Sequence, residues 1–227
     1  MSKGIVVFGV GQWAELAHFY FTHDSPHDVV AFTVDRDYLV EDTLHELPVV
    51  AWEDVEHAYP ASEVSMFVPI SFKRINHARA DKLAEAKAKG YDIVSYVSSK
   101  ATTFPDFSCG ENCFILEDNT IQPYVTIGRN VVMWSGNHIG HHTVIEDHVM
   151  ITSQVVISGA CRIGAYSFFG VNATVRDETV IAPETVVGAG TAIMADTEPF
   201  SVYRIKGTKP SDVRSDRLFS LSHKSGG

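Results

Sequence analysis

The chain has 227 residues, a formal net charge of −10 and a hydrophobic content of 45%. This length allows two modest domains, and an acidic balance without any basic patch argues against a nucleic-acid-binding protein. No apolar run approaches the roughly 18 residues of a membrane span, and the N-terminus lacks the pattern of a secretory signal. We therefore expect no nucleic-acid partner, no membrane insertion and a cytoplasmic location.

The first hundred residues alternate between predicted strands and helices. Apolar strands are predicted at 5–12, where the strand runs into a glycine turn, and at 29–34, 65–68 and 91–97; helices are predicted at 13–22 and 76–89. The second helix is rich in Ala, Lys and Glu and stops at Gly90. This alternation is typical of a parallel sheet covered by helices. We expect residues 1–100 to form an α/β, Rossmann-like half-domain.

The glycine turn after the first strand is a candidate nucleotide site. Gly9 and Gly11 form the first half of a dinucleotide fingerprint, and Gln12 follows them. Such a turn lets a phosphate approach backbone N–H groups at a helix N-terminus. Asp35 ends the second strand, where a ribose or base contact is expected. The alternatives are a plain tight turn and a loop cap. Because the half-domain is small, a nucleotide-sugar fits better than a dinucleotide.

From residue 109 to residue 193 the chain repeats every six residues. The fifth hexad position holds a small or medium side chain, and the first holds a large apolar residue in nearly every hexad: Cys109, Ile115, Ile121, Ile127, Met133, Ile139, Ile145, Ile151, Ile157, Ile163, Phe169, Val175, Ile181, Val187, Ile193. This pattern predicts a hexapeptide β-helix, in which three hexads make one coil of a triangular prism. We assign residues 101–198 to this domain and residues 199–227 to a C-terminal loop or tail. The three cysteines fall on inward positions and have no metal-ligand spacing.

The period also predicts neighbours in space. Residues 18 apart lie one coil above each other, at roughly the 4.8 Å spacing of adjacent strands. Gly159 should therefore lie over His141, and Ala160 over His142.

Four of the eleven histidines fall within residues 138–148, none on an inward hexad position. We do not expect them to be buried core histidines. They could be solvated corners, packing groups at a subunit contact or a composition bias. The functional interpretation makes His141 a general base, since an imidazole suits proton removal near neutral pH. The backbone N–H of Gly159 would then stabilise the oxyanion of an acyl transfer.

Taken together, these motifs resemble the sugar acyltransferases of the left-handed β-helix superfamily. The chain is most similar to the branch of sialic acid O-acetyltransferases and bacillosamine-pathway N-acetyltransferases, from Lys3 to about Pro210. The resemblance implies a left-handed parallel β-helix, a homotrimer with active sites between adjacent prisms, and acetyl-CoA as co-substrate without a metal. The outward aromatics Trp134, Tyr124 and Phe168 would suit such an interface.

The resemblance also implies roles for single residues. The family's catalytic histidine follows an Ile-Gly or Ile-Glu pair, which matches His141 after Ile139-Gly140. His142 stands where the family often has a carboxylate, which leaves open whether Glu146, Asp147 or a neighbouring chain orients His141. Met150 occupies the place of a second histidine that contacts the acetyl group. The implied acetyl-CoA contacts are Met150, Gly159, Gly188, Lys206 and Lys209, although the two lysines could equally be solvated.

The leading hypothesis is an acetyl-CoA-dependent N-acetyltransferase. Its acceptor would be the amino group of a 4-amino-4,6-dideoxysugar linked to UDP, dTDP or GDP, for bacterial surface glycans such as the O-antigen of lipopolysaccharide. A sialic-acid-type sugar O-acetyltransferase is the close alternative. A zinc enzyme like the γ-type carbonic anhydrases and a non-catalytic trimeric scaffold represent other classes.

Overall fold

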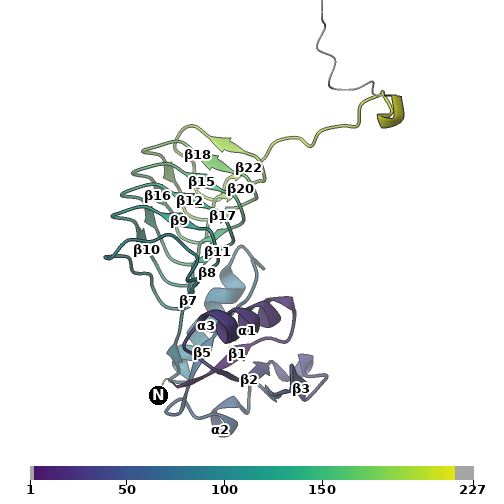
Figure 1. Cartoon of the computed structure of the whole chain (residues 1–227), viewed down its shortest axis with the longest axis vertical. Helices are drawn as coiled ribbons and strands as arrows, with labels where there is room; N and C mark the ends of the chain where they lie inside the picture. The colour runs from purple at the N-terminus through teal and green to yellow at the C-terminus, as the bar shows by residue number, and fades with distance from the viewer. Residues whose placement is uncertain (1–2, 218–227) are drawn as a thin grey trace, which may run out of the picture.

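The computed structural model describes residues 3–217. It consists of an α/β domain with a triangular β-helix stacked against it (Figure 1). The last ten residues of the predicted tail, 218–227, lie outside the described residues.

The N-terminal domain is built on a six-stranded sheet with the order β3-β4-β2-β1-β5-β6. All neighbouring strands are parallel except the β3–β4 pair. Its elements are β1 (Gly4–Phe8), α1 (Gln12–Asp24), β2 (Val29–Val34), η1 (Arg36–Tyr38), β3 (Thr43–Leu44), β4 (Leu47–Ala51), α2 (Val55–Ala58), β5 (Val64–Phe67), α3 (His77–Ala88) and β6 (Asp92–Ile93). The sequence did not predict η1, β3, β4 or α2.

Helices cover both faces of this sheet. Alternate residues of a strand point to opposite faces, and accordingly Ile5 and Val7 pack with Phe21 of α1, whereas Val6 and Phe8 pack with Ala86 of α3. This arrangement leaves the carboxyl ends of β1 and β2 next to the glycine turn.

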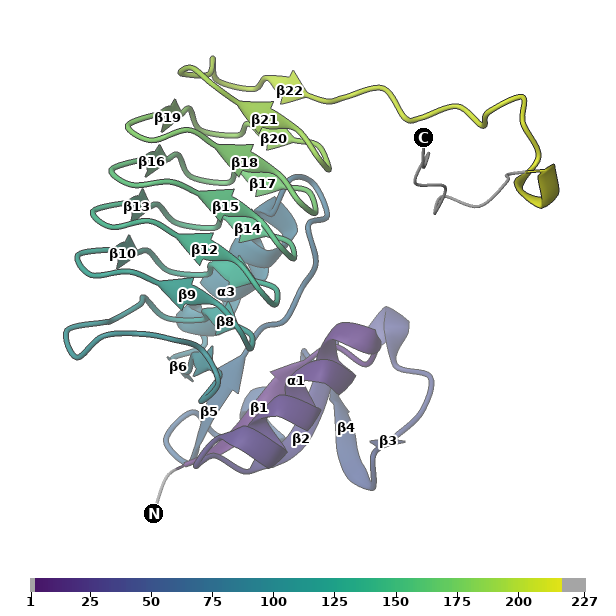
Figure 2. The same ribbon diagram turned by 45° about the horizontal axis from the view of Figure 1, so that its top comes forward.

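Three parallel sheets of very short strands form the prism. One sheet has the order β10-β13-β16-β19, the second β21-β18-β15-β12-β9, and the third β22-β20-β17-β14-β11-β8-β7. The strands are β7 (Tyr96–Val97), β8 (Phe114–Ile115), β9 (Thr120–Ile121), β10 (Thr126–Ile127), β11 (Val132–Met133), β12 (His138–Ile139), β13 (Val144–Ile145), β14 (Met150–Ile151), β15 (Val156–Ile157), β16 (Arg162–Ile163), β17 (Phe168–Phe169), β18 (Thr174–Val175), β19 (Val180–Ile181), β20 (Val186–Val187), β21 (Ala192–Ile193) and β22 (Val202–Tyr203). These stacked parallel sheets fit a left-handed β-helix, as Figure 2 shows from a second direction.

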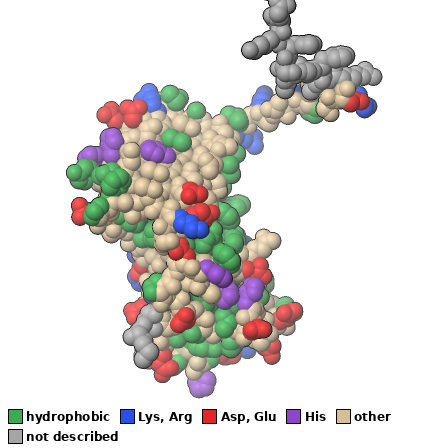
Figure 3. All heavy atoms as spheres, in the orientation of Figure 1, with side chains coloured by type: hydrophobic (Ala, Val, Ile, Leu, Met, Phe, Trp, Pro, Cys, Tyr) green, Lys and Arg blue, Asp and Glu red, His purple; other side chains and the backbone are tan. Residues whose placement is uncertain are grey.

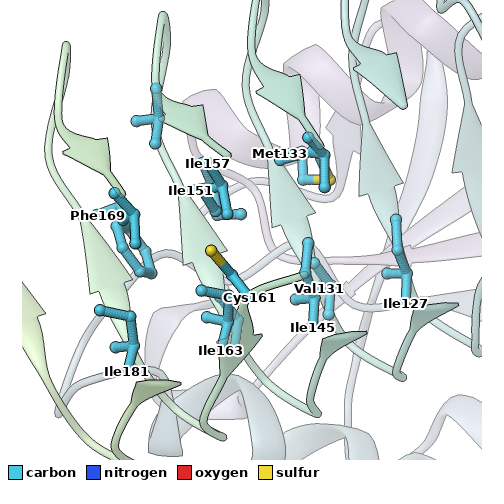
Figure 4. Packing of buried hydrophobic residues seen from close by; sticks show 14 of the residues in the cluster. Ile127, Val131, Met133, Ile145, Ile151, Ile157, Cys161, Ile163, Phe169 and Ile181 are labelled. Carbon is cyan, nitrogen blue, oxygen red and sulfur yellow. The ribbon is translucent and has the colours of Figure 1, made fainter. Parts of the chain in front are cut away.

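The prism confirms the predicted repeat. Strand partners are 18 residues apart, as in Ile127 with Ile145 and Ile151 with Phe169. The large hexad residues fill the interior, where Ile145, Ile151 and Ile157 are at most 1% exposed (Figure 4). Every sixth residue from Asn112 to Gly190 has a positive φ and turns a corner, so each hexad supplies one short strand and one bend.

The predicted strand at 91–97 is wrong as a single element. Its first part, β6, closes the N-terminal sheet, whereas β7 pairs with β8 in the prism. The prism therefore begins before residue 101, because Tyr96 and Val97 already pair with Phe114 and Ile115. At the other end, β22 pairs with β20, so part of the expected tail continues the prism.

The two domains share a core along the seven-stranded sheet. Phe114, Val132 and Met150 point out of the prism and pack with residues of the N-terminal domain. Trp134 and Phe168 lie here too, with ring centroids 5.4 Å from Trp13 and 5.2 Å from Phe72 respectively. The prediction that Trp134 and Phe168 are exposed interface aromatics is wrong, because the chain's own first domain covers them.

A buried arginine ties α3 to the prism. Arg79 is fully buried, and its guanidinium donates to Asn130 Oδ1 at 3.0 Å and to the carbonyl oxygens of Asn130, His148 and Ile70. Burial lowers its pKa to about 9. The guanidinium bonds oxygens from both domains, which fixes their relative position.

Candidate active site

His141 lies at the corner that follows β12. We use the name histidine corner for residues 140–143 together with the residues 18 positions before and after them, which lie one coil below and above. The residue is exposed, because the third hexad position points away from the prism interior. Its backbone N–H donates to Gln122 Oε1 at 2.8 Å. The bond from the preceding coil fixes the backbone of this corner and leaves the imidazole at the surface.

Gly159 lies directly against the His141 ring, as the 18-residue period predicts. A Cβ placed on Gly159 would lie 2.7 Å from His141 Cε1 and 2.8 Å from its Nε2. The Ala160 N–H donates to the His141 carbonyl oxygen at 2.7 Å, which confirms the predicted stacking of the two coils. Only a residue without a side chain fits here while the ring keeps this position.

The Gly159 N–H is available to a ligand. At the same hexad position, the N–H groups of Arg129, His141 and Ala165 donate to side-chain oxygens of the chain, whereas those of Ser135 and Ser153 have no acceptor among the described residues. Within residues 3–217, no hydrogen bond from the Gly159 N–H is found. The corner thus places an unused backbone donor beside an imidazole, the pair of groups that acyl transfer requires.

His142 is the residue that contacts His141. The two Nδ1 atoms are 3.1 Å apart, a hydrogen bond in which one ring donates and the other accepts. His142 adopts a left-handed conformation, with a φ of 60°, and its ring lies 4.7 Å from the Tyr124 ring. If His141 donates from Nδ1, its Nε2 keeps a free lone pair.

The carboxylates considered for orienting His141 serve elsewhere in this chain. Asp147 accepts from Arg129, both at the backbone N–H and at Nε, and Glu146 bonds Arg162 and the backbone N–H of Ala165. Within one chain, the side chain that bonds the His141 ring is therefore His142 and not a carboxylate.

The other two histidines of the cluster differ from each other. His138 is half-buried on β12, whereas His148 is 8% exposed and its Nδ1 bonds Asn130 Nδ2 at 2.8 Å. Burial lowers the pKa of His148 to about 4. The prediction that no histidine of the cluster is buried is wrong for His148, because its corner faces α3 and not solvent.

The predicted acetyl-CoA residues are not gathered around His141. Met150 is 2% exposed and packs in the core between the domains, so its side chain offers no surface to a coenzyme, which corrects its assignment. Gly188 follows β20 at another corner of the prism, where its N–H donates to the Tyr203 carbonyl oxygen. Lys206 and Lys209 are exposed in the extended segment after β22. In one chain, only Gly159 of this set contacts His141.

The glycine turn has the geometry of an anion site. Gly9 has a φ of +106°, which only glycine adopts easily, and Gly11 is the N-cap residue of α1 without any side-chain cap. The N–H groups of Ala14 and Glu15 donate to the Gly11 carbonyl oxygen. Among the described residues, no acceptor is found for the N–H groups of Gln12 and Trp13, which begin the helix. These free donors and the helix dipole favour a phosphate.

Asp35 stands at the predicted strand end but already has a partner. Its Oδ1 accepts from Lys82 Nζ of α3 at 2.7 Å, and Lys82 also bonds Glu85. The turn thus brings Gly9, Gly11 and Gln12 together, with the Asp35 carboxylate held by α3.

The sequence analysis did not predict a cavity that lies below the histidine corner. A cavity of about 540 Å³ one coil below His141 is lined by Phe104, Pro105, Asp106, Phe107, Ser108, Gln122, Pro123, Tyr124, Val125 and Thr126. The 18-residue coil period could have placed one lining residue of this cavity, since Tyr124 is 18 residues before His142 and therefore lies one coil below it. Figure 3 shows histidine side chains both on the flank of the prism and over the N-terminal domain.

Two kinds of feature are not found in the part of the chain that the structure describes. No group of three or more His, Cys, Asp or Glu side chains is placed to hold a metal ion. Across residues 3–217, none of the helices combines the length and the apolar character that crossing a membrane requires.

No protein-family profile matches the chain. An acyl-[acyl-carrier-protein]–UDP-N-acetylglucosamine O-acyltransferase from Burkholderia lata is 24% identical over 102 residues, which cover 45% of this chain and 34% of that protein. A second, from Burkholderia thailandensis, is 24% identical over 44% of this chain and 43% of its own length. The chain thus spans less than half the length of these curated relatives.

Solved structures match over both domains. The acetyltransferase domain of PglB from Neisseria gonorrhoeae, in complex with acetyl coenzyme A, matches with a TM-score of 0.76 at 18% identity, over 88% of this chain and 94% of that one. A variant of the perosamine N-acetyltransferase from Caulobacter crescentus, with CoA and GDP-perosamine, has a TM-score of 0.68 at 21% identity, over 90% and 97%. WeeI from Acinetobacter baumannii has a TM-score of 0.67 at 18% identity, over 86% and 93%. The chain therefore has the fold of these proteins, in its N-terminal domain as well as in its prism.

Proposed function

We propose that this protein is an acetyl-CoA-dependent N-acetyltransferase. Its acceptor is the amino group of a nucleotide-linked sugar, of the class of 4-amino-4,6-dideoxysugars carried by UDP, dTDP or GDP for bacterial surface glycans. The observation that carries this proposal is the contact between the His141 ring and Gly159, whose N–H is unused. The fold shared with proteins solved with acetyl-CoA, CoA or GDP-perosamine supports it.

The reaction needs two groups from the protein. The amine nitrogen attacks the thioester carbonyl carbon, the C–S bond breaks, and the acetyl group becomes an amide while the thiol leaves. His141 Nε2 takes the proton of the attacking amine and passes it to the departing sulfur, which leaves as the thiol. The Gly159 N–H donates to the carbonyl oxygen as it becomes negative. Because the thioether of Met150 has no hydrogen-bond donor, the Gly159 N–H carries more of the oxyanion stabilisation.

His142 is a positioning residue in this scheme. By accepting a hydrogen bond from His141 Nδ1–H across 3.1 Å, His142 holds the tautomer whose Nε2 is unprotonated. A histidine in this position provides the acceptor that the family obtains from a carboxylate. Tyr124 packs against its ring and limits its rotation.

The N-terminal domain would bind the nucleotide. The free N–H groups of Gln12 and Trp13 at the start of α1 suit the diphosphate, and Gly9 and Gly11 let it approach the backbone. Asp35 borders this site, with its carboxylate already bonded to Lys82. We thus propose that residues 1–100 form a Rossmann-like half-domain that binds the nucleotide-sugar.

A homotrimer would complete the active site. His141 and Gly188 lie at different corners of one prism, and Lys206 and Lys209 lie in the extended segment after β22. Contact between adjacent prisms could bring these elements from one copy to His141 of the next. In this arrangement, Gly188, Lys206 and Lys209 of one copy would contact the coenzyme bound at His141 of the next. The proposal also includes a cytoplasmic location.

The test is release of free thiol from acetyl-CoA with a panel of UDP-, dTDP- and GDP-linked 4-amino-deoxysugars. We expect release that depends on one amino sugar nucleotide and falls about 100-fold or more in His141→Asn, the usual scale for a lost general base. His57→Asn, an exposed histidine of α2, is the matched control. Undiminished turnover in His141→Asn would contradict the assignment.

The panel also separates the other hypotheses. Release with free sialic acid alone would indicate an O-acetyltransferase. No release with any acceptor, together with bound zinc, would favour the zinc enzyme; no release and no metal would favour a scaffold.

A further inference from the structure

A cavity of about 260 Å³ lies beside the glycine turn in the N-terminal domain. Its lining consists of one aromatic, four aliphatic and two polar residues: Tyr38, Val10, Val40, Leu44, Val49, Thr43 and Glu41. None of these residues belongs to the site proposed from the sequence.

The cavity adjoins the phosphate site. Val10 stands between Gly9 and Gly11, so the turn with free N–H groups is also one wall of the cavity. Tyr38 ends η1, which follows β2, and Val49 lies on β4, the parallel neighbour of β2. A nucleotide whose diphosphate meets the start of α1 would place its base within reach of this cavity.

The walls suit a flat, largely apolar ring. In the chain alone, Tyr38 is 64% exposed and Val40 is 90% exposed. A planar ligand that covers these exposed apolar side chains would bury their apolar surface, and a tyrosine ring offers a face on which such a ligand can stack. A nucleobase has this shape.

Glu41 is the only charged residue in the lining. The two cations near this region already have partners, Arg36 with Asp54 and Lys82 with Asp35. For Glu41, no hydrogen bond or ion pair is found within residues 3–217, so its carboxylate is free to meet a ligand.

A carboxylate accepts hydrogen bonds and donates none. The edge of guanine presents two adjacent donors, N1–H and the N2 amino group, which match the two carboxylate oxygens in a charge-assisted pair. Uracil and thymine present a single N3–H between two carbonyl oxygens, one of which would face the carboxylate. We propose that this cavity holds the nucleobase and that Glu41 selects guanine, so the sugar substrate is linked to GDP.

This inference rests on the proposed nucleotide site, and one experiment tests both. Calorimetry would measure the binding of GDP, UDP, dTDP and ADP to the full chain and to Glu41→Gln. We expect GDP to bind about tenfold more tightly than UDP or dTDP, the effect of one charge-assisted pair, and Glu41→Gln to abolish this preference by weakening GDP alone. Glu46→Gln is the matched control and should change nothing, because Glu46 is an exposed glutamate of the nearby β3–β4 turn outside the lining.

The outcomes are distinct. Equal or tighter binding of UDP or dTDP overturns the guanine assignment and leaves the proposed function intact. A loss of equal size for all four nucleotides in Glu41→Gln also overturns it, because Glu41 would then bond the ribose. Binding of none of the four nucleotides would overturn the nucleotide site itself.

Discussion

Replacing Gly159 by alanine tests the geometry of the proposed catalytic corner. The new Cβ would lie 2.7 Å from His141 Cε1 and 2.8 Å from Nε2. Ordinary contacts between such atoms begin near 3.5 Å, so the ring must move by about 0.8 Å. The φ of Gly159 lies outside the left-handed region, so alanine adds no backbone strain. The substitution displaces the imidazole and spares the fold.

A displacement close to 1 Å at a reacting group costs about 100-fold in rate. We expect Gly159→Ala to lower kcat by roughly this factor while the melting temperature stays within about 2 °C of the parent, as for a change that leaves folding stability nearly unaltered. Thiol release under saturating acetyl-CoA measures kcat, and thermal unfolding provides the control. The ¹⁵N shifts of the His141 ring would report its movement independently. A stable variant with a displaced ring and normal kcat would refute the role of His141 as base.

Three further predictions concern stability. Ile151→Ala removes a fully buried side chain of the prism and should cost about 2–5 kcal/mol in urea unfolding; a smaller loss would mean that the prism core rearranges. Because burial holds the pKa of His148 near 4, the unfolded chain, with a pKa near 6.5, binds a proton first as the pH falls. Stability is therefore complete above about pH 6.5 and should fall by about 3 kcal/mol between pH 6.5 and 4; a His148→Gln variant should show a shallower decline over that window, and an identical decline would assign it to other groups. Arg79→Met leaves the carbonyl oxygens of Ile70, Asn130 and His148 without their donor and should destabilise the chain by about 3 kcal/mol or more; unchanged urea unfolding would show that water replaces the guanidinium.

The histidine corner could be predicted because it depends on the repeat alone. A period of six places every first residue inside, and a coil of 18 places Gly159 over His141 whatever the rest of the chain does. The partner of His141 was not predictable, because a side-chain hydrogen bond depends on rotamers. Glu146 and Asp147 are close in sequence, but arginines hold both, and His142 is the contact.

The sequence by itself determined what lies inside the prism, where its coils stack and where the glycine turn ends a strand, because these features follow from local periods and backbone preferences. Only the tertiary structure decided the fate of residues that point outward. Met150, Trp134 and His148 occupy outward positions of the repeat, yet each is covered by the N-terminal domain. A repeat specifies which side of its own strand a residue takes, whereas its contact with solvent depends on which sheet another domain packs against. The same packing decided that Tyr96 and Val97 belong to the prism. The packing of α3 on the N-terminal sheet decided that the Asp35 carboxylate binds Lys82.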